Sequence, residues 1–241
     1  MLRNYIIFMR ELHVFGKVEF IRSHRAKRIT VKILSEGLRV SLPFRASESH
    51  ATRFILDNKD SILSKQKRVQ AKKVGTRITT DNEIQTLTFT VKVKYANRKD
   101  VFFNLREGIL SIEVPEEADL QSNDVQQICW NGINYFLKKE AKKILPTRVG
   151  ELASTFGFRF SGVKIQSSKT RWGSCSKEQN INLSFYMLLL PQHLVDYVIL
   201  HELCHTKEMN HGDKFWKLMD DVTQGKTKKL RVEMKRYGMP S

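Results

Sequence analysis

The chain has 241 residues, 41% of them hydrophobic, so it is long enough to bury one large core or two smaller ones. Its 42 Lys and Arg residues outnumber its 25 Asp and Glu residues, which gives a net charge of +17 at pH 7. No apolar run approaches the length of a membrane helix, and three cysteines are too few for a disulfide framework. The composition therefore excludes a membrane-spanning protein and a disulfide-rich secreted domain.

The charge and the N-terminal residues bear on partners and location. A positive field attracts phosphate groups, in a nucleic acid or in a nucleotide, although a basic surface can also serve solubility alone. Near the N-terminus only Tyr5–Met9 is continuously apolar, which is too short for the core of a signal peptide. We therefore expect a cytoplasmic protein with no membrane partner. Nucleic-acid association through the basic surface is one hypothesis.

The first part of the chain is predicted to be rich in strands. Short apolar or alternating runs flank a turn at Ser35–Gly37. They predict two or three strands that together form a hairpin with one buried face; the candidates are Val18–Ile21, Ile29–Ile33 and Leu38–Leu42.

Residues 47–73 are predicted to form one polar, basic helix. Ser47 or Ser49 could cap its start, and a sparse apolar stripe follows at helical spacing. Its end, Lys65–Lys73, is the densest basic stretch of the chain. This stretch is either a solvated helix face or a surface that contacts phosphate.

A second group of strands follows this helix. Residues 87–95 alternate apolar and polar side chains and form the clearest predicted strand. Val101–Phe103 and Ile109–Val114 predict two more strands, joined by a turn at Arg106–Gly108.

The acidic break Pro115–Asp119 is the predicted domain boundary. It separates a β-rich N-terminal region with one basic helix, residues 1–118, from a second region, residues 119–241. A long helix over residues 121–156 opens the second region, and Pro146 is expected to end or kink it.

Short strands and two helices are predicted for the rest of the second region. The strands, joined through Arg171–Ser176, are Phe158–Phe160, Val163–Ile165 and Asn180–Phe185. The run from Pro191 to Leu203 has helical spacing, and residues 226–236 predict a final helix with a basic outer face.

The strongest functional signal is the pattern H-E-x-x-H at His201–His205, inside a predicted helix. Positions i and i+4 lie on one helix face, so both imidazoles can reach one ion. A catalytic zinc ion has three protein ligands and an open position for water. Glu202 lies about 100° round the helix from His201 and can accept a proton from that water. The pattern predicts a metal-dependent hydrolase with one Zn²⁺ ion.

His211 is the preferred third ligand. Its distance from His201 matches the spacing of metzincin proteases, but Glu208 occupies the position of the metzincin glycine. Asn210, which tolerates a left-handed conformation, could make the required turn instead. The alternative third ligand is a carboxylate from Glu208 or Asp213.

Two segments carry a family resemblance. One is Tyr197–His205, followed by Met209–His211 and Phe215–Trp216; the other is Thr170–Ser176, followed by Ile181–Leu183 and Leu188–Pro191. In this order and spacing, the C-terminal half resembles the YgjP-type predicted metal-dependent hydrolases, which are relatives of the WLM and SprT-like zinc metalloproteases. The N-terminal half is also similar, at Arg25–Ile29, Glu36–Val40 and Pro43.

The resemblance implies metal ligation by His201, His205 and His211 and a general base at Glu202. It also implies an α+β fold, in which a β-rich N-terminal part precedes a compact zincin-like core of the minigluzincin type that carries the H-E-x-x-H helix. It does not decide the substrate. The family name covers presumed peptidases, while some relatives are described as nucleotide pyrophosphatases that act on UTP.

The segment before Cys175 is expected to lie beside the metal helix and to bind substrate. In zincin-like enzymes a sheet edge next to this helix commonly holds the substrate backbone by strand addition. The residues expected to bind substrate are Arg171, Trp172, Gly173 and Ser174. The alternative is a structural role, with Trp172 packing in the core and Gly173 making a turn.

Other polar residues near the motif have open roles. Cys175 could bind metal or act as a nucleophile, but three histidines already complete a catalytic set. His193, Tyr186 and Tyr197 are candidates for stabilising an oxyanion, and the sequence does not choose between them.

The leading hypothesis is a zinc-dependent metallopeptidase that acts on a peptide or protein. Zinc polarises the scissile carbonyl, and Glu202 activates water and passes the proton to the leaving amine. The first alternative is a metal-dependent UTP pyrophosphatase, although no Gly-rich phosphate loop is present. The second is a basic nucleic-acid-associated module, or a protease directed to proteins on DNA.

Overall fold

The computed structural model describes residues 12–34, 37–75 and 77–239, except for the side chains of residues 68–75. Tyr5–Met9, part of the predicted turn at Ser35–Gly37 and most side chains of Lys65–Lys73 therefore lie outside the described residues. The fold is a mixture of helices and sheets, divided into two compact units: unit 1, Met1–Arg77, and unit 2, Ile78–Ser241.

Unit 1 is built on a three-stranded sheet. A short 3₁₀ helix, η1 (Leu12–Phe15), precedes β1 (Lys17–Ser23), β2 (Thr30–Leu34) and β3 (Gly37–Pro43). The sheet order is β1-β3-β2, with β1 parallel and β2 antiparallel to β3. The predicted hairpin is thus confirmed. One face is apolar because Leu38, Val40 and Leu42 alternate with polar residues, and it packs on the helices that follow.

The single predicted helix over residues 47–73 is wrong, because the chain breaks at Asn58. Two helices form instead, α2 (Glu48–Asp57) and α3 (Lys59–Gly75). The Asn58 side-chain amide donates to the Phe54 carbonyl at 2.9 Å, and so satisfies a carbonyl at the end of α2. At the start of α2, Ser47 is the N-cap, and its hydroxyl accepts the N–H of His50.

Unit 2 begins with a four-stranded sheet of order β4-β5-β7-β6. Its strands are β4 (Ile84–Gln85), β5 (Thr90–Ala96), β6 (Phe102–Arg106) and β7 (Ile109–Pro115). The β6–β7 hairpin confirms the turn at Arg106–Gly108. The strand predicted at residues 87–95 starts three residues late, because a turn closes between Thr86 and Phe89 through backbone and hydroxyl hydrogen bonds of 2.9 Å.

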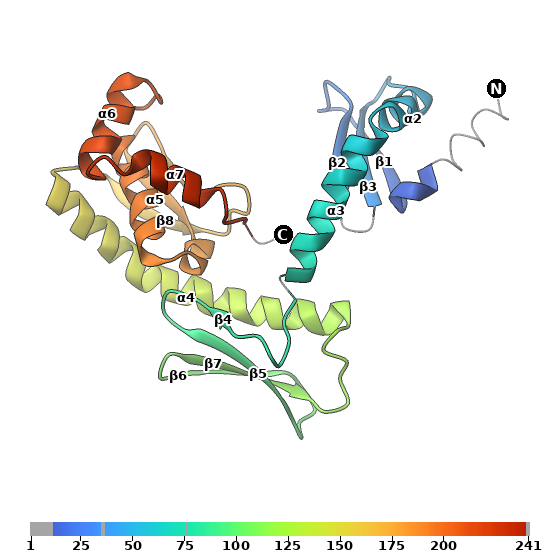
Figure 1. Ribbon diagram of the computed structural model, residues 1–241, viewed down its shortest axis with the longest axis horizontal. Helices are drawn as coiled ribbons and strands as arrows, with labels where there is room; N and C mark the ends of the chain where they lie inside the picture. The colour runs from blue at the N-terminus through green and yellow to red at the C-terminus, as the bar shows by residue number, and fades with distance from the viewer. Residues whose placement is uncertain (1–11, 35–36, 76, 240–241) are drawn as a thin grey trace. The chain divides into compact units, whose positions relative to one another are not determined.

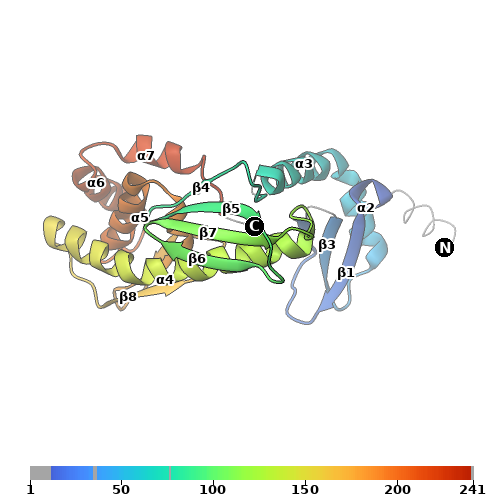
Figure 2. The ribbon, with the colours of Figure 1, turned by 90° about the horizontal axis from the view of Figure 1, so that it is seen from below.

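The long helix α4 (Asn123–Phe156) is the scaffold of unit 2. Its apolar face, from Cys129 to Val149, belongs to the main core. It lies between the four-stranded sheet and the later elements of the unit (Figure 1), and the strands run along it (Figure 2). Pro146 does not end the helix, which continues for ten residues to a left-handed C-cap at Gly157.

The sheet and α4 share one core, and this places the unit boundary earlier than residue 118. A Cβ on Gly132 would lie 2.1 Å from the Phe103 ring, so only glycine lets β6 pack so closely on α4. Leu110, Ile112 and Val114 of β7 are buried in the same cluster as α4. The predicted boundary at 118/119 therefore falls inside unit 2, between elements that have no separate cores.

The remaining elements of unit 2 form a small sheet and a helical layer. The sheet has the order β8-β10-β9, with β8 (Gly162–Gln166) parallel and β9 (Gly173–Cys175) antiparallel to β10 (Asn180–Ser184). The strand predicted at Phe158–Phe160 is not formed. After η2 (Phe185–Leu189) come α5 (Gln192–Cys204), α6 (Asp213–Val222) and α7 (Thr227–Met234). Within the described residues, every helix is too short or too polar to cross a membrane.

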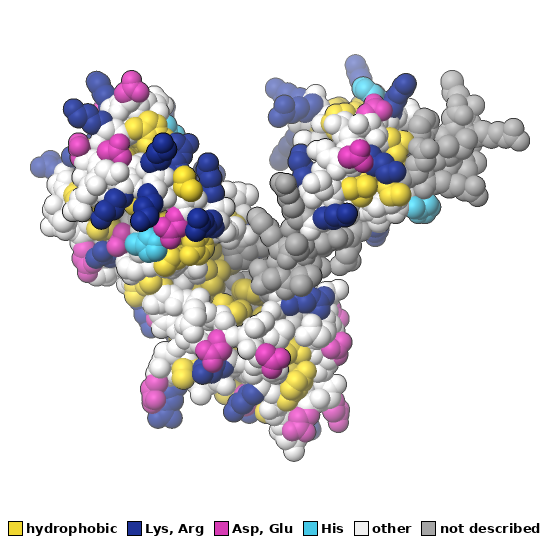
Figure 3. All heavy atoms as spheres, in the orientation of Figure 1, with side chains coloured by type: hydrophobic (Ala, Val, Ile, Leu, Met, Phe, Trp, Pro, Cys, Tyr) yellow, Lys and Arg dark blue, Asp and Glu magenta, His cyan; other side chains and the backbone are white. Residues whose placement is uncertain are grey.

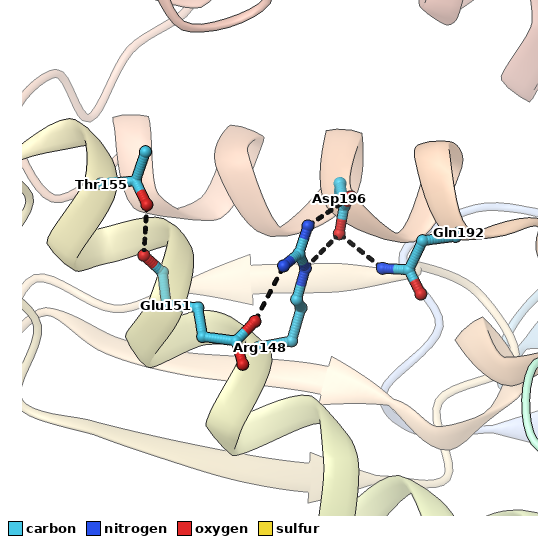
Figure 4. Close-up of polar contacts among 5 residues, drawn as sticks. All are labelled: Arg148, Glu151, Thr155, Gln192 and Asp196. Atoms are coloured by element: carbon cyan, nitrogen blue, oxygen red, sulfur yellow. Dashed lines mark hydrogen bonds and ion pairs between the residues drawn. The ribbon is translucent and has the colours of Figure 1, made fainter.

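A charged clamp joins α4 to the start of α5. The Arg148 guanidinium donates to both Asp196 oxygens, at 2.7 and 2.8 Å, and to Glu151 at 2.8 Å. Gln192 donates to the same Asp196 carboxylate at 2.8 Å (Figure 4). The two carboxylates raise the pKa of Arg148, and the hydrogen bond that Arg148 donates to Asp196 is the largest cause. The bidentate pair fixes α5 on α4 in direction as well as in position.

Breaking this clamp should destabilise unit 2. We expect Asp196→Ala to lower the free energy of unfolding by about 1–3 kcal/mol, since hydrogen bonds to charged groups are lost from a half-buried pair. All three tryptophans, Trp130, Trp172 and Trp216, lie in unit 2, so urea unfolding followed by tryptophan fluorescence reports on this unit.

The matched control for the clamp is Arg106→Ala. Arg106 pairs with Glu107, but both side chains are 81% exposed, so the expected loss is below about 0.5 kcal/mol. Equal losses for Asp196→Ala and Arg106→Ala would contradict the clamp.

Candidate metal centre

The H-E-x-x-H pattern lies at the C-terminal end of α5. His201 and Glu202 belong to the last turn of the helix, and His205 is its C-cap. The helix is held by apolar residues on most of its circumference, all buried: Leu194, Val195, Val198, Ile199, Leu200 and Leu203. Because the buried part precedes the pattern, the ring nitrogens of the histidines project from a rigid end of the helix.

The structure brings the three predicted histidines together. One ligand nitrogen from each of His201, His205 and His211 lies within 4.8 Å of the others. The Nε2 atoms of His201 and His211 are 3.0 Å apart, close to the roughly 3.3 Å expected between two nitrogens bound tetrahedrally to zinc. The three side chains thus fit a single small cation.

The turn that brings back His211 is helical in character. The amides of Lys207 and Glu208 donate to the Cys204 carbonyl, at 3.0 and 2.9 Å, and so continue the winding beyond α5. Neither Glu208 nor Asn210 has a positive φ, so the expected left-handed turn at Asn210 is wrong. A glycine is therefore not needed at position 208.

A backbone contact sets the tautomer of His205. Its Nδ1 lies 3.1 Å from the Glu208 carbonyl oxygen, which can only accept. Nδ1 must therefore carry the proton, and Nε2 keeps a lone pair for a metal ion. The role of Glu208 is this backbone contact. Its carboxylate and that of Asp213, the alternative third ligands, do not belong to the described cluster.

Burial keeps His201 and His205 in the form that binds metal. Burial lowers the pKa of His201 to about 3, helped by the nearby charges of His205, His211 and Arg231. Burial also lowers the pKa of His205, against the opposing effect of its backbone hydrogen bond. Both rings are therefore neutral at pH 7, as metal ligation requires.

Aromatic side chains of α6 form the wall behind the histidines. The fully buried Phe215 ring contacts all three, with centroid distances of 4.9, 4.6 and 4.7 Å to His201, His205 and His211. Trp216 stacks on His211 at 5.5 Å, and the Arg231 guanidinium lies 4.8 Å from the Trp216 ring centroid. This wall restricts the imidazole orientations and adds a positive charge near the cluster.

Glu202 is the only buried charged residue among those that the structure describes, with 5% of its surface exposed. Burial raises its pKa to about 8, and the charge of Arg171 opposes the shift. Its Oε2 is buried and accepts no hydrogen bond within the described structure. An unpaired buried carboxylate is costly, so its presence beside three histidines points to a water molecule or a cation as its partner.

The segment at 171–174 lies next to this carboxylate. A Cβ on Gly173 would come within 2.7 Å of Oε1 and Cγ of Glu202, so the glycine lets β9 pass directly over the carboxylate. Arg171 is exposed and acts on Glu202 through its charge. Trp172 packs against the main core, and Ser174 is paired in register with Asn182.

The structure also places the candidates for stabilising an oxyanion and for acting as a nucleophile. The imidazole of His193 pairs with Glu233 of α7 at 2.8 Å, and Tyr186 is buried in the core against Phe185. Tyr197 remains near the cluster, with its ring 6.4 Å from that of His201. Cys175 is half-buried beside Glu202, and burial raises its pKa, as does the Glu202 charge. A raised pKa disfavours the thiolate that a nucleophile needs.

Sequence reasoning assigned no role to Phe215, Trp216 or Arg231. The two aromatic residues are visible in the sequence as a pair shortly after His211. Arg231 is one of several cations in the final helix, and nothing in the local sequence sets it apart. Its position near the histidines follows from how α7 packs on α5 and α6.

Comparison with known proteins identifies the family of this chain. Residues 27–237 match the family model "YgjP-like, metallopeptidase domain", which confirms the resemblance seen in the sequence. No curated protein matches the chain.

Two solved structures are similar to part of this chain. The metallopeptidase zymogen jannalysin of Methanocaldococcus jannaschii is 25% identical, covering 37% of this chain and 92% of that one, with a TM-score of 0.34. The metallopeptidase zymogen abylysin of Pyrococcus abyssi is 24% identical, covering 39% and 97%, with a TM-score of 0.34.

The buried Glu202 carboxylate should make the metal-free protein less stable at high pH. Because the folded state raises the Glu202 pKa, stability is complete below the ordinary value of 4.5 and falls as the pH rises to about 8. We expect chelator-treated Glu202→Gln to be more stable than the chelator-treated parent near pH 8, by on the order of 1–3 kcal/mol, with no gain near pH 4.5. Urea unfolding at both pH values measures this difference in stability. His201 is present in both proteins, so its contribution to the pH dependence cancels in the difference. A Gln variant that is the less stable one near pH 8 would contradict the effect.

Proposed function

This chain belongs to the YgjP-like metallopeptidase family and is a metal-dependent hydrolase, and from this premise we propose that it is a zinc-dependent peptidase. In this proposal His201, His205 and His211 hold one Zn²⁺ ion, Glu202 is the general base, and unit 2 carries a zincin-like core. The observation that carries it is the buried, unpaired Glu202 carboxylate beside three converging imidazoles, one with its tautomer set for ligation.

The donor set suits the proposed ion. Imidazole nitrogens of His201, His205 and His211 would hold the ion, and three protein ligands are the number found in catalytic zinc sites. Zinc bound there would polarise a carbonyl and make water acidic enough to ionise near neutral pH. The identity of the ion is part of the proposal, because imidazole also suits other transition metals.

Glu202 is suited to moving the proton. A base works best with a pKa near the working pH, and burial has moved the pKa of this carboxylate to about 8. A divalent cation held by the three histidines would lower that pKa again, towards neutrality. Glu202 takes a proton from water and then gives it to the leaving amine, so one carboxylate serves both steps.

The free edge of β9 supports a peptide as substrate. Trp172 and Ser176 direct backbone groups to β10, where the Trp172 carbonyl accepts from Ser184 at 2.8 Å and the Ser176 amide donates to Asn180 at 2.9 Å. In an antiparallel pair alternate residues face one side, so the backbone groups of Gly173 and Cys175 face the free edge. An extended peptide can pair with them, next to Glu202.

Each residue expected to bind substrate has a distinct part in this proposal. Gly173 supplies backbone groups at the edge, while Ser174 keeps β9 in register with β10. Arg171 offers an exposed positive charge to the peptide, and Trp172 anchors the segment in the core. The sequence contains no Gly-rich phosphate loop, which favours peptides over UTP as the substrate class.

Replacing Glu202 tests the mechanism. We expect Glu202→Gln to retain its zinc and to lower turnover of a fluorogenic peptide library by about 10²–10⁴-fold, because the general base is lost. Glu208→Gln is the matched control, since only the backbone of Glu208 contacts His205. Pyrophosphate release from UTP is measured in parallel. Release that the parent shows and Glu202→Gln lacks, without peptide cleavage, would replace the peptidase by a nucleotide hydrolase.

Adding one methyl group above the base tests the role of Gly173. In Gly173→Ala the new Cβ collides with the Glu202 carboxylate, so we expect kcat to fall about 10–100-fold at unchanged zinc content. Gly150→Ala, in α4, adds the same methyl where no atom lies within 4 Å and should leave kcat unchanged. Full activity of Gly173→Ala would show that the close approach of β9 and Glu202 is unimportant.

A further inference from the structure

The positive charge of the chain is concentrated in unit 1. Its 77 residues contain 18 Lys and Arg against 6 Asp and Glu, a net charge of +12. Unit 2, with more than twice the residues, contains 24 against 19, a net charge of only +5. Figure 3 shows Lys and Arg side chains over the visible face of unit 1, with few acidic ones among them. Solubility does not require this asymmetry, which points to a polyanion as a partner of unit 1.

Two loops at one end of the sheet carry much of this charge. The first connects β1 to β2 and contains Arg25, Lys27 and Arg28; the second follows β3 and contains Arg45. They lie together because the C-terminal ends of the parallel strands β1 and β3 meet at one edge. All four side chains are exposed, and none has an ion-pair partner among the side chains that the structure describes.

An aromatic pair lies between the same loops. The rings of His24 and Phe44 stack with centroids 4.5 Å apart and planes at 17°. Phe44 is 58% exposed, which is unusual for so large an apolar side chain, and His24 is also exposed. The stacked pair offers a flat surface to solvent, and the four cations lie in the same two loops.

Arg22 holds this platform in place. Its guanidinium donates to the carbonyls of Phe44 and Ala46, both at 2.9 Å, and to the Glu48 carboxylate at 3.3 Å. Through these contacts the loop after β3 is tied to the end of β1. The platform is therefore formed before any partner binds, which reduces the entropy lost on binding.

We infer that this end of unit 1 is a binding site for single-stranded nucleic acid. Arg25, Lys27, Arg28 and Arg45 neutralise phosphates of the strand, and an unpaired base stacks on the Phe44–His24 platform. The site is formed by residues of unit 1 alone and does not depend on the proposed peptidase activity.

Two features favour this partner over other polyanions. Three of the four cations are arginines, whose planar, forked donors match phosphate oxygens. An exposed stacked pair adds binding energy for a planar base, whereas an acidic polypeptide or an anionic membrane surface gains little from it. Duplex bases are already stacked on each other and cannot use the platform.

Binding of the full chain to labelled oligothymidylate and oligouridylate, measured by fluorescence anisotropy at several salt concentrations, tests the site. Phe44→Ala should weaken binding roughly tenfold, because base stacking is lost. The variant with Arg25, Lys27, Arg28 and Arg45 all changed to Gln should reduce the slope of log K against log salt by roughly 3, at about 0.7 for each phosphate contact.

The matched control removes four exposed positive charges from unit 2, by changing Lys138, Lys139, Lys142 and Arg159 to Gln. It should leave both affinity and salt slope close to those of the parent. Circular dichroism of each variant checks that unit 1 remains folded. Phe44→Leu, which keeps an apolar side chain but removes the ring, should bind like Phe44→Ala.

Four results would overturn the inference. The first is that the control variant weakens oligonucleotide binding as much as the four-fold unit 1 variant does, and the second is that duplex DNA binds more tightly than single strands. The third is that both Phe44 variants bind as the parent does, and the fourth is that polyglutamate or phosphatidylserine vesicles bind with the same affinity as the oligonucleotides. The last two would leave only a charged surface that attracts any polyanion. Retained single-strand binding by Glu202→Gln, with the losses described above, would support the site independently of the hydrolase.

Discussion

One constraint governs unit 2: α5 is buried along most of its length, while its last turn must present polar groups to a small cation and a substrate. The apolar residues from Leu194 to Leu203 satisfy the first half of this constraint, and the Arg148–Asp196 clamp fixes the start of the helix. Phe215, buried against all three histidines, supports the other end. These contacts hold both ends of the helix that carries two members of the histidine cluster.

The same burial makes the site intrinsically unfavourable without a ligand. Glu202 is placed under the backbone of β9 with an unpaired oxygen, and the ring nitrogens of His201 and His211 approach to 3.0 Å. The unpaired Glu202 oxygen lowers the stability of the metal-free fold, and a cation or a water molecule would relieve this cost. Strain of this kind is characteristic of functional sites, where the surrounding core offsets it. Here that core is the face of α4 that packs on two layers of unit 2.

The division into two units changes how the charge is understood. When the sequence is divided near residue 120, both halves are basic and the charge has no focus. The four-stranded sheet, however, packs on α4, so the structural boundary lies at Arg77/Ile78. Divided there, the net charge of +12 falls on the smaller unit. The two units therefore present different chemistry: a nearly balanced unit with a metal centre and a strongly basic one with an exposed aromatic pair.

The sequence alone determined the features that depend on the spacing of neighbouring residues. The i, i+4 histidines, the alternating strands, the hairpins and the family resemblance all follow from residues close together in the chain. Even there, side-chain hydrogen bonds to the backbone changed two predicted elements: Asn58 divides the predicted helix, and the turn at Thr86 delays the start of β5. Only the tertiary structure decided the features that join distant segments: the contact of Gly173 with Glu202, the wall made by Phe215 and Trp216, the clamp between Arg148 and Asp196, and the unit boundary. These depend on which apolar faces pack together, and an apolar face does not specify its partner until the whole core is formed.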